Sequence, residues 1–155
     1  MTKRRRAGLV AASCVYAFAV WWMTLRPSIY DAEVGGILGE VLRLLAASPA
    51  TAWVSFDVVE SAANVAMFVP LGLLVAAWGG RWWQGLVLAA ALSTAIELTQ
   101  LWFLPTRVAD VRDVVANTGG AGIGLLVAAG WRRWRRSSQQ SHNARHRKLI
   151  DTSAQ

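Results

Sequence analysis

Residues 83–104 read WQGLVLAAALSTAIELTQLWFL, an apolar stretch in which Glu97 is the only charged residue. As an α-helix this stretch is about 33 Å long, enough to cross the hydrocarbon core of a bilayer, which is about 30 Å thick. The buried helices of small water-soluble domains are usually shorter than this. The stretch therefore predicts a transmembrane helix.

The composition of the whole chain supports a membrane protein. Of its 155 residues, 55% are hydrophobic and 16% are charged, whereas about 25% are charged in typical soluble domains. Further apolar stretches flank residues 83–104, and we predict spans over 7–25, 61–79, 83–104 and 114–131. The second span contains Pro70, where we expect a kink. The predicted fold is an all-α integral membrane protein built as a bundle of four transmembrane helices.

Basic residues predict how the bundle is oriented. Twelve of the sixteen Lys and Arg residues lie in residues 1–6, at Arg81 and in residues 132–155. Cytoplasmic flanks of membrane helices are enriched in Lys and Arg, so we place both termini in the cytoplasm of a multi-pass cell-membrane protein. We expect residues 132–155 to form a disordered tail. No recognition motif accompanies the basic runs, so we expect no nucleic-acid partner.

The connection between the first two spans is long and, in this topology, extracellular. Apolar residues recur in it at helical spacing, while Glu40 and Arg43 fall off the apolar stripe. The stripe consists of Val34, Ile37, Leu38, Val41, Leu42 and Leu45. This pattern predicts an amphipathic helix that lies on the outer leaflet. Closer to the second span, we interpret Asp57 and Glu60 as solvated loop charges.

Glu97 is the strongest functional signal within the spans. It shares one helix face with Ser93 and Gln100, at positions i−4 and i+3. A carboxylate at this depth is costly unless it faces the bundle and has partners. We therefore expect these side chains to point into the bundle near its outer end.

A second polar stripe starts the fourth span, with its members spaced by three or four residues. These members are Asp110, Asp113, Asn117, Gly120 and Gly124. Arg107 precedes the stripe, and Asn64 opens the second span at the same outer level. We predict that these polar residues form one cluster with Glu97 and Gln100, and that Arg107 binds an anion or pairs with the carboxylates.

A structural interpretation of the same residues stays open. Asp113 and Asn117 could cap the fourth span, and Glu97 and Gln100 could form interhelical hydrogen bonds without any ligand. Gly120 and Gly124 favour close helix packing. The isolated Cys14 and the histidines of the polar tail offer no metal site, so we expect no metal and no cofactor.

Three segments together resemble the VanZ-like family over residues 57–128. They are NVAMFVPLG at Asn64–Gly72, ELTQ at Glu97–Gln100 and RVADVRDVVANTGG at Arg107–Gly120. The order and spacing of the three motifs make the resemblance specific. It implies a small bacterial membrane protein related to one associated with low-level teicoplanin resistance. Relatives often have a basic residue and a histidine after the aspartate matching Asp57, whereas this chain has Val58, Val59 and Glu60.

We carry three functional hypotheses forward. The first is an outer-leaflet polar pocket, formed by Asn64, Glu97, Gln100, Arg107, Asp110, Asp113 and Asn117, that binds a lipid-linked cell-wall precursor or a lipoglycopeptide. The second is a membrane enzyme with Glu97 or Asp113 as general base on a lipid-linked substrate. The third is an accessory subunit without a ligand, held together by Pro70, Gly72, Gly120 and Gly124. Beyond these candidates, the sequence indicates neither catalytic residues nor the oligomeric state of the protein.

Overall fold

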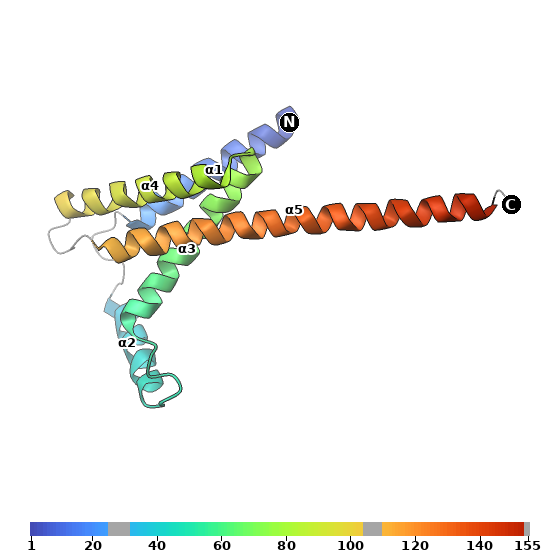
Figure 1. Cartoon of the computed structure of the whole chain (residues 1–155). Helices are drawn as coiled ribbons and strands as arrows, with labels where there is room; N and C mark the ends of the chain where they lie inside the picture. Colours follow the sequence, from blue (N-terminus) through green and yellow to red (C-terminus); the bar gives the residue numbers. More distant parts are fainter. Residues whose placement is uncertain (25–31, 104–109, 154–155) are drawn as a thin grey trace.

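The computed structural model describes residues 1–24, 32–103 and 110–153, and the regular structure within these ranges is helical. Figure 1 shows the helices α1 Lys3–Thr24, α2 Ala32–Ala46, α3 Phe56–Trp78, α4 Trp82–Phe103 and α5 Val111–Ser153. Helices α1, α3 and α4 and the part of α5 up to Gln139 are long and apolar enough to cross a membrane. The predicted all-α architecture with four apolar spans is confirmed to this extent.

The other three long helices pack around α3. Its largest contact is with α5, which it crosses; α4 packs against both α3 and α5, and α1 packs against α3. Helices α1 and α4 end where α3 and α5 begin (Figure 1). We call this end of the bundle, where Thr24 and Gln100 lie, the polar end.

Glycines allow the backbones of α3 and α5 to touch. A Cβ added to Gly120 would collide with the carbonyl oxygen of Val65, and one added to Gly72 would collide with that of Ala121. Gly124 lies equally close to the α3 backbone at Val69. Since lipid provides little hydrophobic driving force between helices, such close packing is a main source of their association.

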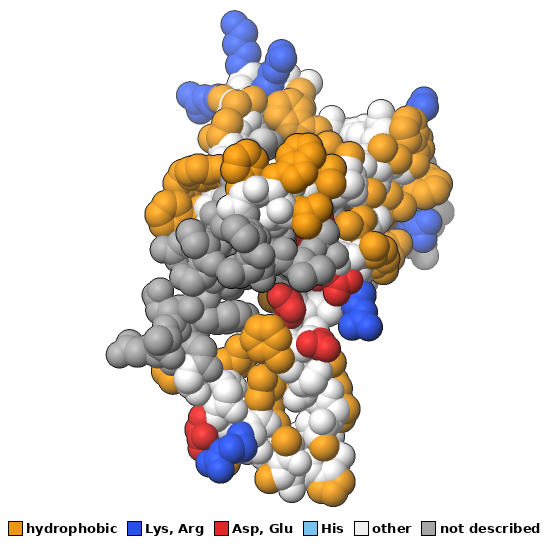
Figure 2. Space-filling view, turned by 90° about the vertical axis from the view of Figure 1, so that its left-hand side faces the viewer, with side chains coloured by type: hydrophobic (Ala, Val, Ile, Leu, Met, Phe, Trp, Pro, Cys, Tyr) orange, Lys and Arg blue, Asp and Glu red, His pale blue; other side chains and the backbone are white. Residues whose placement is uncertain are grey.

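The side chains that lie between the helices form a small core around Phe68. This ring is fully buried and packs with Leu71, Ala89 and Ala121. The outside of the bundle is apolar as well: Val87 and Leu126 are 60% and 73% exposed. Hydrophobic side chains cover much of the surface seen in Figure 2. An apolar exterior around a partly polar interior suits a lipid environment.

Helix α3 begins at Phe56, five residues earlier than the predicted start at residue 61. Ser55 is its N-cap, and the Ser55 hydroxyl accepts a hydrogen bond from the backbone N–H of Val58 at 3.4 Å. Asp57 in the first turn also suits the positive end of the helix dipole. The interpretation of Asp57 and Glu60 as loop charges was therefore wrong, because both belong to α3.

Two arginines bind the opposite end of α3. Arg5 in α1 donates from Nη2 to the carbonyl oxygen of Ala77 at 3.2 Å, and Arg132 in α5 donates from Nη1 to that of Ala76 at 3.1 Å. Gly79, with φ of 85°, ends the helix in the left-handed conformation. The last carbonyls of a helix lack intrahelical donors, so these contacts satisfy groups that lipid could not.

The later part of helix α5 lies in residues 132–155, which were predicted to form a disordered tail. Helix α5 continues without a break to Ser153. Beyond Gly130 it contains neither Gly nor Pro, and it is rich in Arg, which is a good helix former. Extending an existing helix is much easier than nucleating a new one. The apolar span thus supports the polar extension.

Two other expectations have different outcomes. Pro70 was grouped with the packing glycines; it is exposed, and helix α3 continues through it. A helix does occupy the loop after α1: in α2, Ile37 and Val41 are 67% and 45% exposed, and Arg43 pairs with Glu40. Its position on the membrane surface stays a prediction.

Candidate functional site

A small polar cavity of about 90 Å³ lies at the polar end of the bundle. All four long helices contribute to its walls, because α1 and α4 end here and α3 and α5 begin here. Its polar lining consists of Thr24, Glu60, Asn64, Glu97, Gln100, Asp113 and Asn117. We call this cavity the polar pocket. Figure 2 views the molecule from this end and shows acidic side chains gathered close together.

Glu97 joins α4 to the start of α5. Its side chain is only 8% exposed, and its Oε2 accepts a hydrogen bond from the backbone N–H of Asp110 at 3.0 Å. The Asp110 carboxylate in turn accepts from the N–H of Arg112 at 2.8 Å, as a helix cap does. A carboxylate at a helix start is favoured by the helix dipole. Asp110 thus contributes its backbone to the site, while its exposed side chain caps α5.

Gln100 joins α4 to the end of α1. Its Nε2 donates a hydrogen bond to the carbonyl oxygen of Thr24 at 2.8 Å, and both residues are buried. The Thr24 hydroxyl donates to the Val20 carbonyl at 2.7 Å. The bond from Gln100 gives the last carbonyl of α1 a donor, so it positions α1 at the edge of the polar pocket.

Asn117 is the most buried polar residue of the pocket, with 3% exposure. Its Nδ2 donates to the hydroxyl oxygen of Ser93 at 2.8 Å. Its Oδ1 is buried, and no described residue donates a hydrogen bond to it. A buried acceptor without a donor costs about 1–3 kcal/mol. Because Asn117 lines the polar pocket, this acceptor without a donor lies beside the cavity.

The sequence-predicted residues meet in one place with two exceptions. Asn64, Glu97, Gln100, Asp113 and Asn117 all line the polar pocket. Asp110 reaches it through its backbone alone, and Arg107 lies outside the described residues.

Sequence reasoning missed Glu60 and Thr24. Glu60 is half-buried and lines the polar pocket. Its spacing of four residues from Asn64, which places both on one helix face, was a usable signal. Thr24 contributes its backbone carbonyl, which accepts the hydrogen bond from Gln100. A backbone carbonyl leaves no trace in the sequence, so a threonine at the end of a span does not stand out.

The protein family can be identified by comparison with known proteins. A family model described as VanZ/LLP1 matches residues 13–132. The chain belongs to the VanZ/LLP1 family. No curated protein and no solved structure matches the chain. The VanZ/LLP1 match extends into α1, well beyond the three motifs, and therefore includes Thr24 together with the rest of the polar pocket.

Proposed function

We propose that this VanZ/LLP1 protein binds the polar head of an envelope amphiphile in the polar pocket, at the outer face of the cell membrane. The amphiphile is a lipid-linked cell-wall precursor or a lipoglycopeptide, and its capture lowers susceptibility to teicoplanin-type glycopeptides. The observation that carries the proposal is the buried Oδ1 of Asn117, which has no donor among the described residues and belongs to an acid-lined cavity.

The chemistry of the lining indicates which ligand groups fit. Carboxyl groups of Glu60, Glu97 and Asp113 and the free amide oxygen of Asn117 are hydrogen-bond acceptors. Hydroxyl, amide and ammonium groups are the complementary donors. Sugars, peptides and amino sugars, the polar parts of cell-wall precursors and glycopeptides, are rich in such groups.

The size of the pocket limits how much of the ligand it holds. About 90 Å³ corresponds to roughly three water molecules, whereas pockets for drug-sized ligands measure about 300–1,000 Å³. The polar pocket therefore takes one donor group of the head. The remainder of the amphiphile must lie outside it.

The proposed orientation predicts a labelling pattern. Cysteines placed at Ser48 and Ser138, both exposed, should differ in intact cells when native Cys14 is replaced by Ser. Ser48→Cys should react with an impermeant thiol reagent, whereas Ser138→Cys should react only after permeabilisation, because the basic flanks favour the cytoplasmic side. Labelling of Ser138→Cys alone would mean that the polar pocket faces the cytoplasm.

The binding proposal is tested with two charge-removing variants. Glu97→Gln and Asp113→Asn keep the shape of each side chain and remove its charge-assisted hydrogen bond to the ligand. We expect each to reduce the amphiphile that co-purifies per folded protein by about tenfold, equivalent to about 1.4 kcal/mol. Mass spectrometry of co-purifying lipids measures this loss, and teicoplanin susceptibility should rise in parallel.

Asp57→Asn is the matched control, because this exposed acid lies on α3 outside the polar pocket. It should retain the amphiphile. Full retention in Glu97→Gln and Asp113→Asn, with unchanged melting temperature, would show that these groups only bridge helices. Conversion of the retained species to a product by the wild type would instead establish an enzyme.

A further inference from the structure

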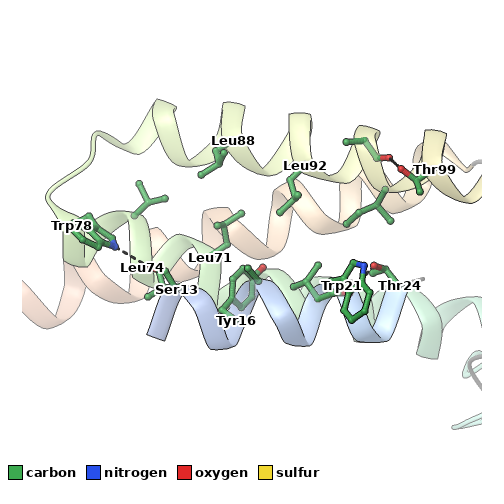
Figure 3. Close-up of a pocket in the computed structure, with 15 residues that line it drawn as sticks. Ser13, Tyr16, Trp21, Thr24, Leu71, Leu74, Trp78, Leu88, Leu92 and Thr99 are labelled. Atoms are coloured by element: carbon green, nitrogen blue, oxygen red, sulfur yellow. Dashed lines mark hydrogen bonds between the residues drawn. The ribbon is translucent and has the colours of Figure 1, made fainter. Parts of the chain in front are cut away.

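A second, larger cavity of about 500 Å³ lies between α1, α3 and α4 (Figure 3). We call it the apolar groove. Helices α1 and α4 form its sides, and Leu71 and Leu74 of α3 form its base, while Leu88 and Leu92 point into it from α4. Apart from a few hydroxyl and indole groups, its lining is hydrocarbon, so it is suited to an apolar occupant.

The groove has two ends, which we call the Trp78 end and the Thr24 end. At the Trp78 end the indole Nε1 of Trp78 donates a hydrogen bond to the hydroxyl of Ser13 at 3.2 Å, which joins α3 to α1 (Figure 3). At the other end lie Thr24 and Thr99. Along α1, the distance from Ser13 to Thr24 is about 16 Å, close to half of the roughly 30 Å hydrocarbon core. The groove is therefore about as long as one leaflet is thick.

The Thr24 end of the groove adjoins the polar pocket. Thr24 and Ile96 line both cavities. The hydrogen bond from Gln100 to the Thr24 carbonyl lies at this junction. A molecule with a polar head and a linear chain could thus place its head in one cavity and its chain in the other without crossing a helix.

We propose that the apolar groove holds one linear hydrocarbon chain of the amphiphile whose head is bound in the polar pocket. This inference rests on the proposed function, because the head supplies the affinity. A chain gains little by moving from lipid tails to an equally apolar groove. The groove instead selects for chain geometry: one chain, lying beside α1 and ending near Ser13 and Trp78.

Tyr16 distinguishes a hydrocarbon chain from a more polar occupant. Its side chain lines the groove, and its buried hydroxyl has no hydrogen-bond partner among the described residues. A hydrocarbon chain cannot satisfy this hydroxyl. Tyr16→Phe should therefore retain the amphiphile at least as well as the wild type, since it removes an unsatisfied polar group and keeps the ring.

The direct test is photo-crosslinking of the full chain in phosphatidylcholine vesicles. The probe is hexadecylamine with a diazirine at the end of its chain, because its ammonium head suits the acid-lined pocket. We expect crosslinks at Leu74 and Trp78, near the Trp78 end. Ala17→Trp should reduce them at least tenfold, because Ala17 lines the groove and the added indole would fill it.

Ala19→Trp is the matched control: the same substitution, two residues away on α1, at an exposed position that does not line the groove. It should leave crosslinking unchanged. Crosslinks spread over the exposed face of α1, at Val15 and Phe18, would overturn the groove assignment. So would loss of binding in Tyr16→Phe, which would mean that a polar ligand group contacts the hydroxyl.

The two proposals fail in different ways. If Glu97→Gln loses the probe, the head is bound as proposed. If Ala17→Trp still crosslinks fully in the groove, the proposed position of the chain is wrong. Groove crosslinking that is insensitive to Glu97→Gln would mean that ordinary lipid fills the groove and that the head is not bound. Both proposals are supported if Glu97→Gln and Ala17→Trp each lose the crosslinks in the groove while Ala19→Trp keeps them.

Discussion

Gly120→Leu and Gly124→Leu should each prevent the bundle from assembling. At these positions a Cβ alone would collide with the α3 backbone, at Val65 and Val69 respectively, and backbone cannot move aside as a side chain can. Overpacking in a core typically costs about 1–3 kcal/mol, and we expect a loss at or above the top of this range because backbone atoms collide. The measurement is the yield of monodisperse protein and its melting temperature in detergent.

Gly130→Leu and Gly119→Leu are the matched controls. They lie on the same helix, but both are exposed, and nothing lies within 4 Å of a Cβ added to either. Both should give normal yields. Equally low yields for all four variants would indicate a general loss of membrane insertion. Normal yields and melting temperatures for all four would contradict the α3–α5 contact.

Phe68→Ala should give the second largest loss of stability. Phe68 is fully buried at the centre of the core, where it packs with Leu71, Ala89 and Ala121. In water-soluble proteins such a truncation costs about 3–5 kcal/mol, of which part is transfer of the ring to water. In a membrane the transfer part is small, while the lost packing remains. We therefore expect a loss of roughly 2–3 kcal/mol.

The readout for Phe68→Ala is unfolding by titration with a denaturing detergent. Leu73→Ala, on the same helix at a 37% exposed position, is the control and should change stability little. Phe68→Leu should recover part of the loss, because it refills part of the cavity. A Phe68→Ala variant as stable as Leu73→Ala would show that the ring faces lipid.

The number and order of the spans could be predicted because length and apolarity are local properties of the chain. The four predicted stretches correspond to α1, α3, α4 and the first part of α5. Helix ends were less predictable, because they depend on single hydrogen bonds. The hydroxyl of Ser55 moves the start of α3 to Phe56. The continuation of α5 beyond the predicted span was not expected, because it extends an existing helix and needs no start signal of its own.

The site residues could be predicted where a polar side chain occurs within an apolar helix. Glu97, Gln100 and Asn117 stand out inside apolar helices, and the structure brings them to one cavity. The contribution of Thr24 was hidden because it is made by a backbone carbonyl. The apolar groove could not be predicted at all. Its lining residues look like any lipid-facing or core residues until the distance between α1 and α4 is known.

Arg5 and Arg132 connect the direction of membrane insertion with the folding of the inserted helices. Each belongs to a basic flank whose charge favours the cytoplasmic side, and each also donates to a terminal carbonyl of α3, Ala77 or Ala76. A chain inserted the other way round would have to move these guanidinium groups to the opposite surface. Two of the basic residues on which the predicted orientation rests thus also bind the first and last spans to α3, so replacing either one would weaken both the predicted orientation signal and the packing of the helices.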